Sequence, residues 1–566
     1  MNKEDFLDSF GHIVEAPGGI SRIRKLILHL AMHGRLVPQD VRHEPASTTI
    51  ASARADRAVW TELTAPAKYN RRDSGYPLGH ADPPAGWTYS RLGEVLQLVN
   101  GRAYKKSEWK GAGTPVIRIQ NLNGGDDYYY SDLHLKPHNY CVTGDLLFAW
   151  SASFGPYLWQ GQRAIFHYHI WKVVTSPALD RQFAFHLLGA MTESVKSASH
   201  GLAMLHMTKE SMEGFVCPIP PLAEQQRIVE RVDELLGLCD ELEEQQAAQV
   251  VARSTLTAAT LHRVSEASQA EELRAAVGAY ADNIGLHLAP GEGDLAALDR
   301  VRQTIRDLAV RGRLTRQDPA KEPAPDLLKR IAAERDHRVK GRANRRPTAL
   351  PPLETNEHAF DVPESWSWTR LGDVCQSRLG KMLDAQKNTG SPTPYLRNSN
   401  VQWGRIELVD VKRIRLEDAE LSEYSLRDGD LLVVEGGEPG RCAIWDSTVA
   451  EGIMVFQKAL HRVRPECGIP PQFIALVLRN AVDSGRLQEL FTGTTIKHLS
   501  GEKLKSFAIP MPPIEEQHRI VERVDQLMSL CDGLEQQFRA AQDARRDLAY
   551  SVAAHAAPAY VENSVV

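Results

Sequence analysis

PPLAEQQRIVERVDELLGLCDELE, residues 220–243, decides the fold of this chain because it occurs twice. The second copy is PPIEEQHRIVERVDQLMSLCDGLE, residues 512–535, and 17 of the 24 aligned positions are identical. Pro221 and Pro513 suit the first position of a helix, where a missing N–H costs nothing. Glu224 and Glu516 place negative charge in the first turn, where the helix dipole favours it. Each copy therefore predicts the start of a long helix.

Apolar residues recur in both copies with a spacing of three and four, which is typical of a heptad seam that packs against a partner helix. A single helix of this kind would be expected to lie on the core of its own domain. Two near-identical helices in one chain favour mutual packing, or equivalent faces presented to one partner. The predicted coiled-coil and partner contacts are Ile228, Val232, Leu235, Cys239 and Leu242 in the first copy and Ile520, Val524, Leu527, Cys531, Leu534 and Phe538 in the second.

The composition is that of a soluble globular protein with several domains. The chain has 566 residues, with 42% hydrophobic and 25% charged residues, and single cores stop growing near roughly 250–300 residues. The sequence lacks a run of about 18 apolar residues and an N-terminal signal peptide, so we expect a cytoplasmic protein. Seven cysteines without a C-x-x-C pair fit a reducing compartment and no zinc site.

Charge is distributed unevenly along the chain. The net charge of −5 argues weakly against nucleic acid as a partner. Residues 222–250 carry eight acidic and two basic side chains, whereas residues 329–346 carry eight basic and two acidic ones. Local charge is therefore more informative than the sum.

The repeat extends beyond the long helices. RIRKLILHLAMHGRLVPQD (22–40) aligns with RVRQTIRDLAVRGRLTRQD (300–318) at 10 of 19 positions. Two aromatic-rich segments with short alternating apolar runs share landmarks in the same order, such as Gly144-Asp145-Leu146-Leu147 and Gly429-Asp430-Leu431-Leu432, and otherwise differ. This pattern predicts one duplicated unit whose helices stayed alike while its globular domains diverged.

The predicted fold class is α+β, with two mixed α/β domains separated by long helices whose seams favour a coiled coil. We expect a helical segment at 1–80, with Gly34 as the C-cap of its first helix. The first globular domain spans 81–218 and the second 361–510. One long helix occupies 219–280, a helical connector 281–360, and a second long helical region 511–566.

The motifs of catalysis are weak or absent. No G-x-x-x-x-G-K-[S/T] phosphate loop occurs. Asp82-Pro83-Pro84-Ala85 lacks the aromatic residue of the amino-methyltransferase motif. The D/E-x-K triplet of metal-dependent nucleases is matched by Glu108-Trp109-Lys110 and Asp410-Val411-Lys412, but it often arises by chance. The His167-Tyr168-His169 segment has no adjacent Cys or carboxylate that could complete a metal site. The sequence therefore predicts a non-enzymatic chain without metal or cofactor.

The paired P-x-P-P-[L/I]-x-E-Q-x-R-I-V-E-R-V-D helices, the G-R-L-x-x-Q-D segments and the W-x-x-x-x-L-G domain entries resemble the specificity subunit of type I restriction–modification systems. The resemblance covers nearly the whole chain. It implies two target-recognition domains that each read one half of a bipartite DNA site, in a system of phage defence. It also implies that the long helices form an antiparallel coiled coil, set the spacing of the half-sites and dock methyltransferase subunits. We expect two methyltransferase subunits, and restriction/translocase subunits that join the complex. S-adenosylmethionine, ATP and Mg²⁺ would then belong to partner subunits. Segment 1–64 would stand to the second half as 298–346 stands to the first.

Duplex readout needs Arg, Lys, Asn and Gln near base edges and phosphates. We predict Arg118, Gln120, Asn121, Arg397, Asn398 and Asn400 as base-edge readers, because both groups follow a probable strand at equivalent positions. The structural alternative is that such arginines are merely solvated and that the asparagines cap turns. The full predicted DNA-binding set is Arg102, Lys105, Lys106, Arg118, Gln120, Asn121, Asn123, Ser151, Ser153, Arg378, Lys381, Lys387, Arg397, Asn398, Asn400, Arg441, Lys497 and His498.

Two other functions compete with this interpretation. The chain could be an interaction scaffold that joins two enzyme subunits without reading DNA, in which case its domains would lack clustered basic and amide side chains. It could also be a fused methyltransferase or nuclease, against which the absent cofactor loop argues.

Overall fold

The computed structural model describes residues 11, 14, 16, 18–62, 72–151, 153–198, 207–267, 269–288, 294–340, 350–384, 388–449, 452–494 and 497–556. The chain divides into two compact units, residues 1–250 with 540–566 and residues 251–539. Both boundaries fall within long helices, α9 (Leu222–Glu266) and α18 (Ile514–Ala556). Among the described residues, no helix is long and apolar enough to cross a membrane.

Two four-stranded sheets form the globular domain of the first unit, with strand orders β2-β9-β6-β7 and β4-β3-β8-β5. A separate antiparallel ribbon of β1 and β10 joins the two ends of the domain, with Thr88 opposite Ile219. The strands are β1 (Thr88–Arg91), β2 (Leu96–Asn100), β3 (Thr114–Ile117), β4 (Tyr129–Ser131), β5 (Tyr140–Cys141), β6 (Leu146–Ala149), β7 (Gly155–Leu158), β8 (Ala164–Phe166), β9 (Ile170–Thr175) and β10 (Val216–Ile219).

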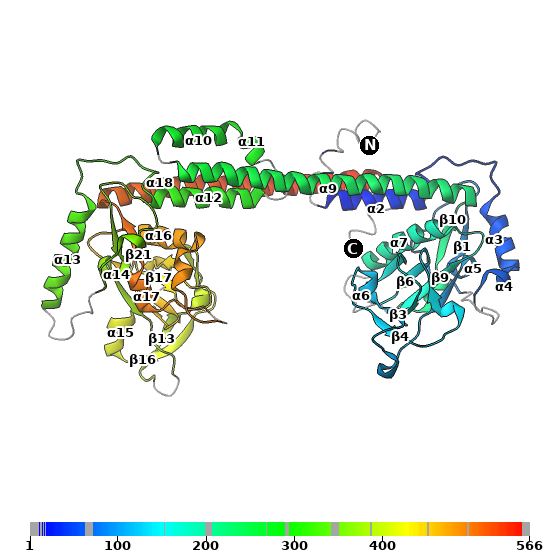
Figure 1. Ribbon diagram of the computed structural model, residues 1–566, viewed down its shortest axis with the longest axis horizontal. Helices are drawn as coiled ribbons and strands as arrows, with labels where there is room; N and C mark the ends of the chain where they lie inside the picture. The colour runs from blue at the N-terminus through cyan, green and yellow to red at the C-terminus, as the bar shows by residue number, and fades with distance from the viewer. Residues whose placement is uncertain are drawn as a thin grey trace. The chain divides into compact units, whose positions relative to one another are not determined.

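The core of this domain follows from the alternation of side chains along β6. Leu146 and Phe148 face helix α7 (Arg181–Ala198) and share one core with the long helix α9, whereas Leu147 faces the second sheet. Successive residues of a strand point to opposite faces, so a strand that is buried on both faces reads as a continuous apolar run. The layers are therefore the long helix, α7, the first sheet and the second sheet (Figure 1).

The second unit repeats this plan with a more divided outer sheet. Its sheets have the orders β12-β20-β17-β18, β16-β13-β19 and β14-β15, and β11 pairs with β21 as β1 pairs with β10. Helix α16 (Pro471–Asp483) takes the place of α7. The strands are β11 (Ser367–Arg370), β12 (Cys375–Leu379), β13 (Ser391–Leu396), β14 (Val401–Gln402), β15 (Arg405–Ile406), β16 (Lys412–Leu416), β17 (Leu431–Val434), β18 (Cys442–Ile444), β19 (Val455–Phe456), β20 (Leu460–Pro465) and β21 (Ala508–Met511).

Shorter helices complete both units. They are α2 (Gly19–Met32), α3 (Ala46–Ala55), α4 (Arg57–Trp60), α5 (Leu92–Val95), α6 (Ile119–Leu122), α8 (Lys209–Gly214), α10 (Ala270–Asp282), α11 (Ile284–His287), α12 (Asp294–Val310), α13 (Ala324–Lys340), α14 (Leu371–Val374), α15 (Asp418–Tyr424) and α17 (Gly501–Ser506). Gly34 lies just past α2 with a φ of 64°, as expected of a C-capping glycine.

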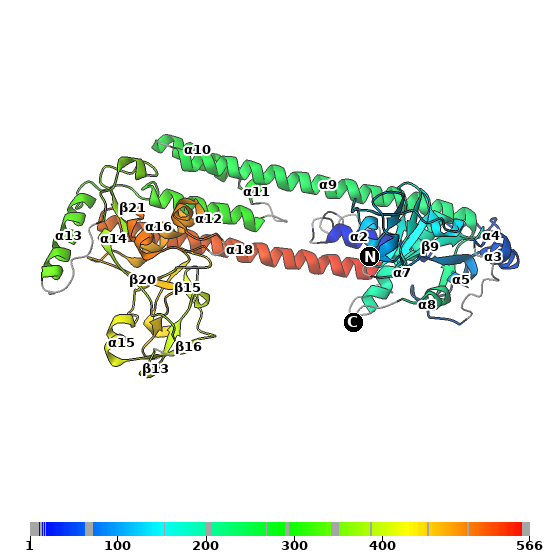
Figure 2. The ribbon, with the colours of Figure 1, turned by 60° about the horizontal axis from the view of Figure 1, so that its bottom comes forward.

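Helices α2 and α12 each join both long helices. In the first unit, Arg24 of α2 pairs with Asp240 and Glu243 of α9, and Arg22 lies over the ring of Tyr550 of α18. In the second unit, Arg302 of α12 bonds Asp532 and Glu535 of α18 at 2.7 Å, and Arg300 donates to a carbonyl of α9. The sequence repeat is therefore a structural repeat as well (Figure 2).

The fold class predicted from the sequence is confirmed, and these contacts refine it. Ile228, Val232 and Cys239 of the predicted seam are buried in the same core as α2 and α7, with Leu235 and Leu242 packed against it. In the second copy, Ile520 and Val524 are buried with α12 and α16, and Cys531 is buried too. Leu527, Leu534 and Phe538 are half-buried. Each long helix therefore packs on the core of its own domain and on a shorter helix, α2 or α12. The heptad spacing alone could not distinguish this packing from direct pairing of the two long helices.

One expectation about the helical regions needs correction. Residues 219–280 are not one helix, because α9 ends at Glu266 and α10 begins at Ala270. Ala276 of α10 packs back against Val264 of α9 and Leu308 of α12. In the described part of segment 1–64, α2 packs on α7 and α9 of its own unit and also reaches Tyr550 of α18, just as α12 packs on its own unit and also reaches α9.

Candidate nucleic-acid interface

The loop after β3 and the loop after β13 have the same construction. In the first domain the backbone N–H of Arg118 donates to Oδ1 of Asn121 at 2.9 Å, and the Asn121 amide donates to the carbonyls of Gly125 and Asp127. In the second, Arg397 N–H donates to Asn400 at 2.9 Å, and Asn400 donates to Glu407 and Asp410. Both amides are therefore used to close the loop.

Burial removes these two asparagines from the surface. Asn121 is 5% exposed and Asn400 is 3% exposed. An amide whose oxygen and nitrogen both bond backbone groups has little left to offer a base edge. We therefore assign both residues a structural role, and the expected base contacts of Asn121 and Asn400 find no geometric support.

The two arginines are held close to their own loops. Arg118 lies 3.9 Å from the ring centroid of Tyr129 and 3.7 Å from the carboxylate of Asp127. Arg397 bonds Asp410 at 2.5 Å. About a fifth of each side chain is exposed, 21% for Arg118 and 20% for Arg397. Each guanidinium is thus positioned and only partly accessible, and Asp410 is used by an ion pair rather than by a metal-binding triplet.

Further polar residues of the first domain gather beside this loop. The amide of Asn123 donates to the hydroxyl of Ser153 at 2.7 Å, and the hydroxyl of Tyr157 donates to Asn123 at 3.0 Å. Gln120 is exposed and donates to the Asp127 carbonyl, and Ser151 is half-buried in the β6–β7 loop. The predicted residues of 118–123 and 151–153 therefore come together.

Arg102, Lys105 and Lys106 form the neighbouring edge of the domain. Arg102 bonds Glu108 at 2.6 Å, and Glu108 also accepts the backbone N–H of Lys105. These two bonds, led by the one from Arg102, hold the pKa of the Glu108 carboxyl below its usual range. Glu108 is therefore a structural anion, and Lys105 and Lys106 remain as exposed cations.

Four predicted residues of the second domain converge at the β17–β18 loop. Arg441 donates to the carbonyl of Asn398 at 3.0 Å, and Asn398 donates to the carbonyl of Gly436. The backbone N–H of Gly437 donates to the carbonyl of Lys497, and the His498 ring lies 3.1 Å from the carboxylate of Glu435. Three segments distant in sequence thus form one surface.

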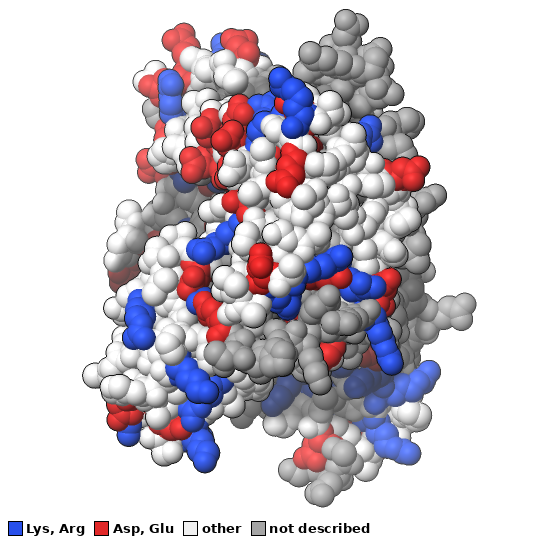
Figure 3. All heavy atoms as spheres, turned by 90° about the vertical axis from the view of Figure 1, so that its right-hand side faces the viewer, with Lys and Arg blue, Asp and Glu red and all other residues white. Residues whose placement is uncertain are grey.

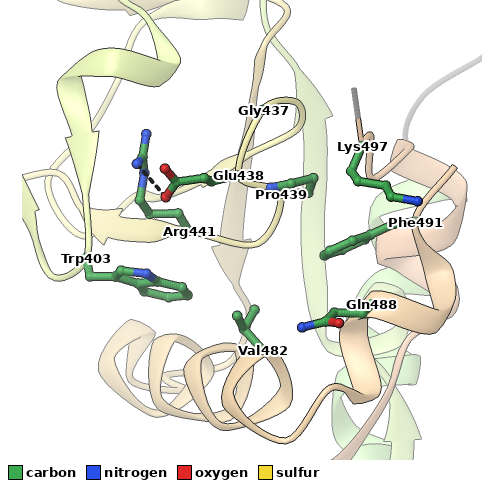
Figure 4. A pocket seen from close by; sticks show the side chains of 9 residues that line it. All are labelled: Trp403, Gly437, Glu438, Pro439, Arg441, Val482, Gln488, Phe491 and Lys497. Carbon is green, nitrogen blue, oxygen red and sulfur yellow. Dashed lines mark hydrogen bonds and ion pairs between the residues drawn. The ribbon is translucent and has the colours of Figure 1, made fainter. Parts of the chain in front are cut away.

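This surface borders a hollow of about 410 Å³. Trp403 and Phe491 stand on opposite sides of it, with Val482 between them, and Lys497 lies at the rim (Figure 4). Arg441 is held there by Glu438 at 2.8 Å. Sequence reasoning missed Trp403 and Phe491. The predicted residues Lys497 and His498, close to Phe491 in the sequence, were the signal that could have pointed to this segment.

Two of the remaining predicted residues are held by acidic side chains of another element. Arg378 pairs with Glu423 and Lys381 pairs with Glu420, both on α15. These ion pairs compensate much of the positive charge. Lys387 lies outside the described residues. The second domain therefore groups Asn398, Arg441, Lys497 and His498, whereas Arg378 and Lys381 pair with α15.

The part of the chain that the structure describes has no cluster of three or more His, Cys, Asp or Glu that could hold a metal ion. Burial is the chief cause that lowers the pKa of His167 to about 4, so this ring is neutral at pH 7. On the face of the first unit in Figure 3, basic and acidic side chains are interspersed among the described atoms. The described atoms of that face therefore do not form one broad basic patch.

Comparison with known proteins returns one family. The model of the type I restriction–modification DNA specificity domain matches residues 84–252 and 363–541. The specificity subunit of the type I restriction enzyme EcoEI from Escherichia coli is 27% identical over 575 residues, which cover 94% of this chain and 93% of the relative. The EcoAI specificity subunit from the same species is 25% identical over 566 residues, covering 94% and 92%.

A solved structure, the HsdS subunit from Thermoanaerobacter tengcongensis, is similar over 82% of this chain and 96% of that one, with 17% identity and a TM-score of 0.39. The two family matches fall on equivalent halves of the internal repeat, and each begins near the entry of a globular domain.

Proposed function

This chain belongs to the family of type I restriction–modification DNA specificity proteins, and from that premise we propose that it gives such a complex its DNA sequence specificity. Each globular domain reads one half of a bipartite site, and the long helices fix the distance between the halves. The observation that carries the proposal is that both halves share one framework, and match the family separately, while their loops differ in chemistry.

The difference between the loops is clear where the frameworks are equivalent. The β6–β7 loop of the first domain contains Trp150, Ser151 and Ser153, whereas the β17–β18 loop of the second contains Glu435 and Arg441. Two readers on a common scaffold must differ in this way to recognise an asymmetric sequence. The residues we propose for contact with DNA are Arg102, Lys105, Lys106, Arg118, Gln120, Asn123, Ser151 and Ser153 in the first domain, and Arg397, Asn398, Arg441, Lys497 and His498 in the second.

The partners and cofactors follow from the same premise. We infer that two methyltransferase subunits dock on the helices, and that restriction/translocase subunits join them. S-adenosylmethionine, ATP and Mg²⁺ would bind to those partners, and this chain would contribute no catalytic group.

The decisive experiment is a binding selection from random DNA duplexes, using the chain co-purified with its candidate methyltransferase subunit. A bipartite motif with a fixed gap is the expected result. As a matched pair, Arg441→Ala in the second domain should relax base preference in one half of the motif and Ser153→Ala in the first domain in the other.

A stable complex that recovers no sequence above background would contradict the proposal. It would favour the alternative in which the chain is an interaction scaffold that joins enzyme subunits without reading DNA.

A further inference from the structure

The turn between β8 and β9 presents an aromatic side chain to solvent. This turn consists of His167, Tyr168 and His169, and the Tyr168 side chain is 40% exposed. Its ring lies 3.9 Å from that of His169 and 4.4 Å from that of His167, measured between centroids. Three adjacent rings at the tip of a turn form an unusual surface, because large aromatic groups are more often buried.

The backbone holds this turn rigidly from three sides. The N–H of His167 donates to Ile117 at 2.9 Å, and the N–H of Trp150 donates to His169 at 3.1 Å. The indole N–H of Trp150 donates to the carbonyl of Tyr168 at 2.9 Å. The exposed ring therefore stands on a fixed base rather than on a mobile loop.

Close packing at Gly101 supports the same conclusion. A Cβ atom at Gly101 would lie 2.1 Å from the carbonyl oxygen of His167. Only glycine allows β2 to approach the turn so closely. Behind the turn, Trp150 stacks on Trp171 with centroids 5.9 Å apart, and Trp171 stacks on Phe148 at 5.9 Å in the core. The turn is thus connected to the buried core through stacked aromatic rings.

The turn also lies among the residues proposed to contact DNA. The backbone of Arg102 forms a β-bridge with His167. Burial chiefly lowers the pKa of His167, and the charges of His169 and Arg118 lower it further. Trp150 begins the loop that carries Ser151 and Ser153. An exposed aromatic group on a turn that adjoins segments with cations and hydroxyls is suited to DNA, since bases offer π-faces and phosphates offer negative charge.

The second domain has the same turn with different chemistry. Gln457, Lys458 and Ala459 connect β19 to β20, and Lys381 bridges Gln457 as Arg102 bridges His167. Gly380 packs against the carbonyl oxygen of Gln457 as Gly101 packs against that of His167. A Cβ atom at Gly380 would lie 2.3 Å from this oxygen. The framework is therefore shared, and an exposed lysine occupies the position of Tyr168.

We propose that Tyr168 is a specificity-determining residue of the first domain, whose ring stacks on a base at a deformable step of the half-site. This inference rests on the proposed function and assigns the turn a direct part in it. A side chain that wedges between base pairs unstacks them, and flexible pyrimidine–purine steps are unstacked most easily. The first half-site should therefore contain such a step. Lys458, at the same place in the second domain, contacts phosphate instead.

The test uses the co-purified complex and four variants. Tyr168→Phe keeps the ring, Tyr168→Leu keeps an apolar side chain without a π-face, Tyr168→Ala removes the contact, and Lys458→Ala is the matched control on the second domain. The readouts are the selected motif, affinity for its best duplex, and the fluorescence of 2-aminopurine placed at each position of the half-site.

Tyr168→Ala should weaken binding about 5-fold to 160-fold, the range for the loss of one base–aromatic stack. It should also reduce the base preference at one step of one half-site. Tyr168→Phe should bind within about threefold of the wild type, and Tyr168→Leu should resemble Tyr168→Ala. The wild type should raise 2-aminopurine fluorescence at that step, and Tyr168→Ala should not. Lys458→Ala should weaken binding to all duplexes to the same extent. It should also reduce the slope of log K against log salt concentration by about one.

The inference is overturned if Tyr168→Ala keeps the wild-type motif and affinity, or if the Phe and Leu variants behave alike. The comparison of these two variants remains valid even if Tyr168→Ala folds poorly, because both keep a large apolar group. Failure of the proposed function itself gives a different result, since the wild-type complex would then select no bipartite motif.

Discussion

A buried carboxylate joins each globular domain to its long helix, and the two copies of this node differ in a way that can be measured. Glu224 accepts the indole N–H of Trp87 at 3.0 Å and the amide of Gln39 at a long 3.4 Å. Glu516 accepts Trp366 at 2.9 Å, and also Gln317 at 2.6 Å and Thr315 at 3.1 Å. Both carboxylates are 1% exposed. The first node therefore has fewer donors to lose.

Replacing each tryptophan by phenylalanine removes the indole N–H at both nodes and the same ring volume. Trp87→Phe leaves Glu224 with one weak bond, whereas Trp366→Phe leaves Glu516 with two good ones. A buried charged acceptor that loses its main donor costs about 1.5–3 kcal/mol. We expect Trp87→Phe to cost about 1–2 kcal/mol more than Trp366→Phe, because the loss of volume cancels between the matched variants.

Hydrogen exchange can measure this difference because each protein contains the intact half as an internal reference. Opening of the first turns of α9, residues 222–232, should become about 5- to 30-fold more frequent in Trp87→Phe than opening of residues 514–524 in Trp366→Phe. Equal loss of protection in the two variants, or none in either, would refute the reasoning from donor number.

The pH dependence of the same variant has a definite sign. Burial is the main cause that raises the pKa of Glu224, and the bond from Trp87 opposes this shift. A carboxyl with a raised folded pKa stabilises the fold most below its unfolded pKa of about 4.3, and this contribution is lost as the pH rises through the folded pKa. Without the indole, the charged form becomes costlier, so the deficit of Trp87→Phe should grow from acid to neutral pH.

Three further predictions concern other parts of the chain. Removing seven residues from α9 near the unit boundary, together with seven from α18, shortens each helix by about 10 Å. The gap between half-sites in the selected motif should therefore shrink by about three base pairs at 3.4 Å each, and an unchanged gap in an active complex would contradict the idea that the helices set the gap. Asn121→Ala and Asn400→Ala should each lower the free energy of unfolding by about 1–3 kcal/mol and weaken DNA binding without changing which base is preferred. A change of preferred base in a variant with unchanged stability would show that these amides contact bases after all. Cys467, the half-exposed thiol among the free cysteines, should be alkylated first, but slowly at pH 8, since burial and Glu334 raise its pKa to about 11; peptide mapping of early-labelled sites checks this order.

Much of the architecture could be predicted from the sequence because it is encoded in local periodicity and in repetition. The 3–4 spacing after Pro221 and Pro513 required long helices, and the repeated landmarks required two related domains. Gly34 marked the end of α2 because a residue with positive φ commonly terminates a helix. The extent of α9 was harder to predict, since the break at 267–269 contains no proline or glycine and α10 is folded back by its contacts with α9 and α12.

The candidate site was predicted in outline and corrected in detail. The sequence alone determined that two frameworks exist, that residues 118–123 and 397–400 occupy equivalent loops, and that these loops differ between the domains. Only the tertiary structure decided that Asn121 and Asn400 turn inward, that Arg441 meets Asn398, and that His167–His169 joins Trp150 on one rigid tip. The physical reason is that helix and strand formation depends on neighbours along the chain, whereas a side chain's partners depend on strand pairing. The pairing of β6 with β9 sets Ala149 opposite Ile170, and no local pattern records that register.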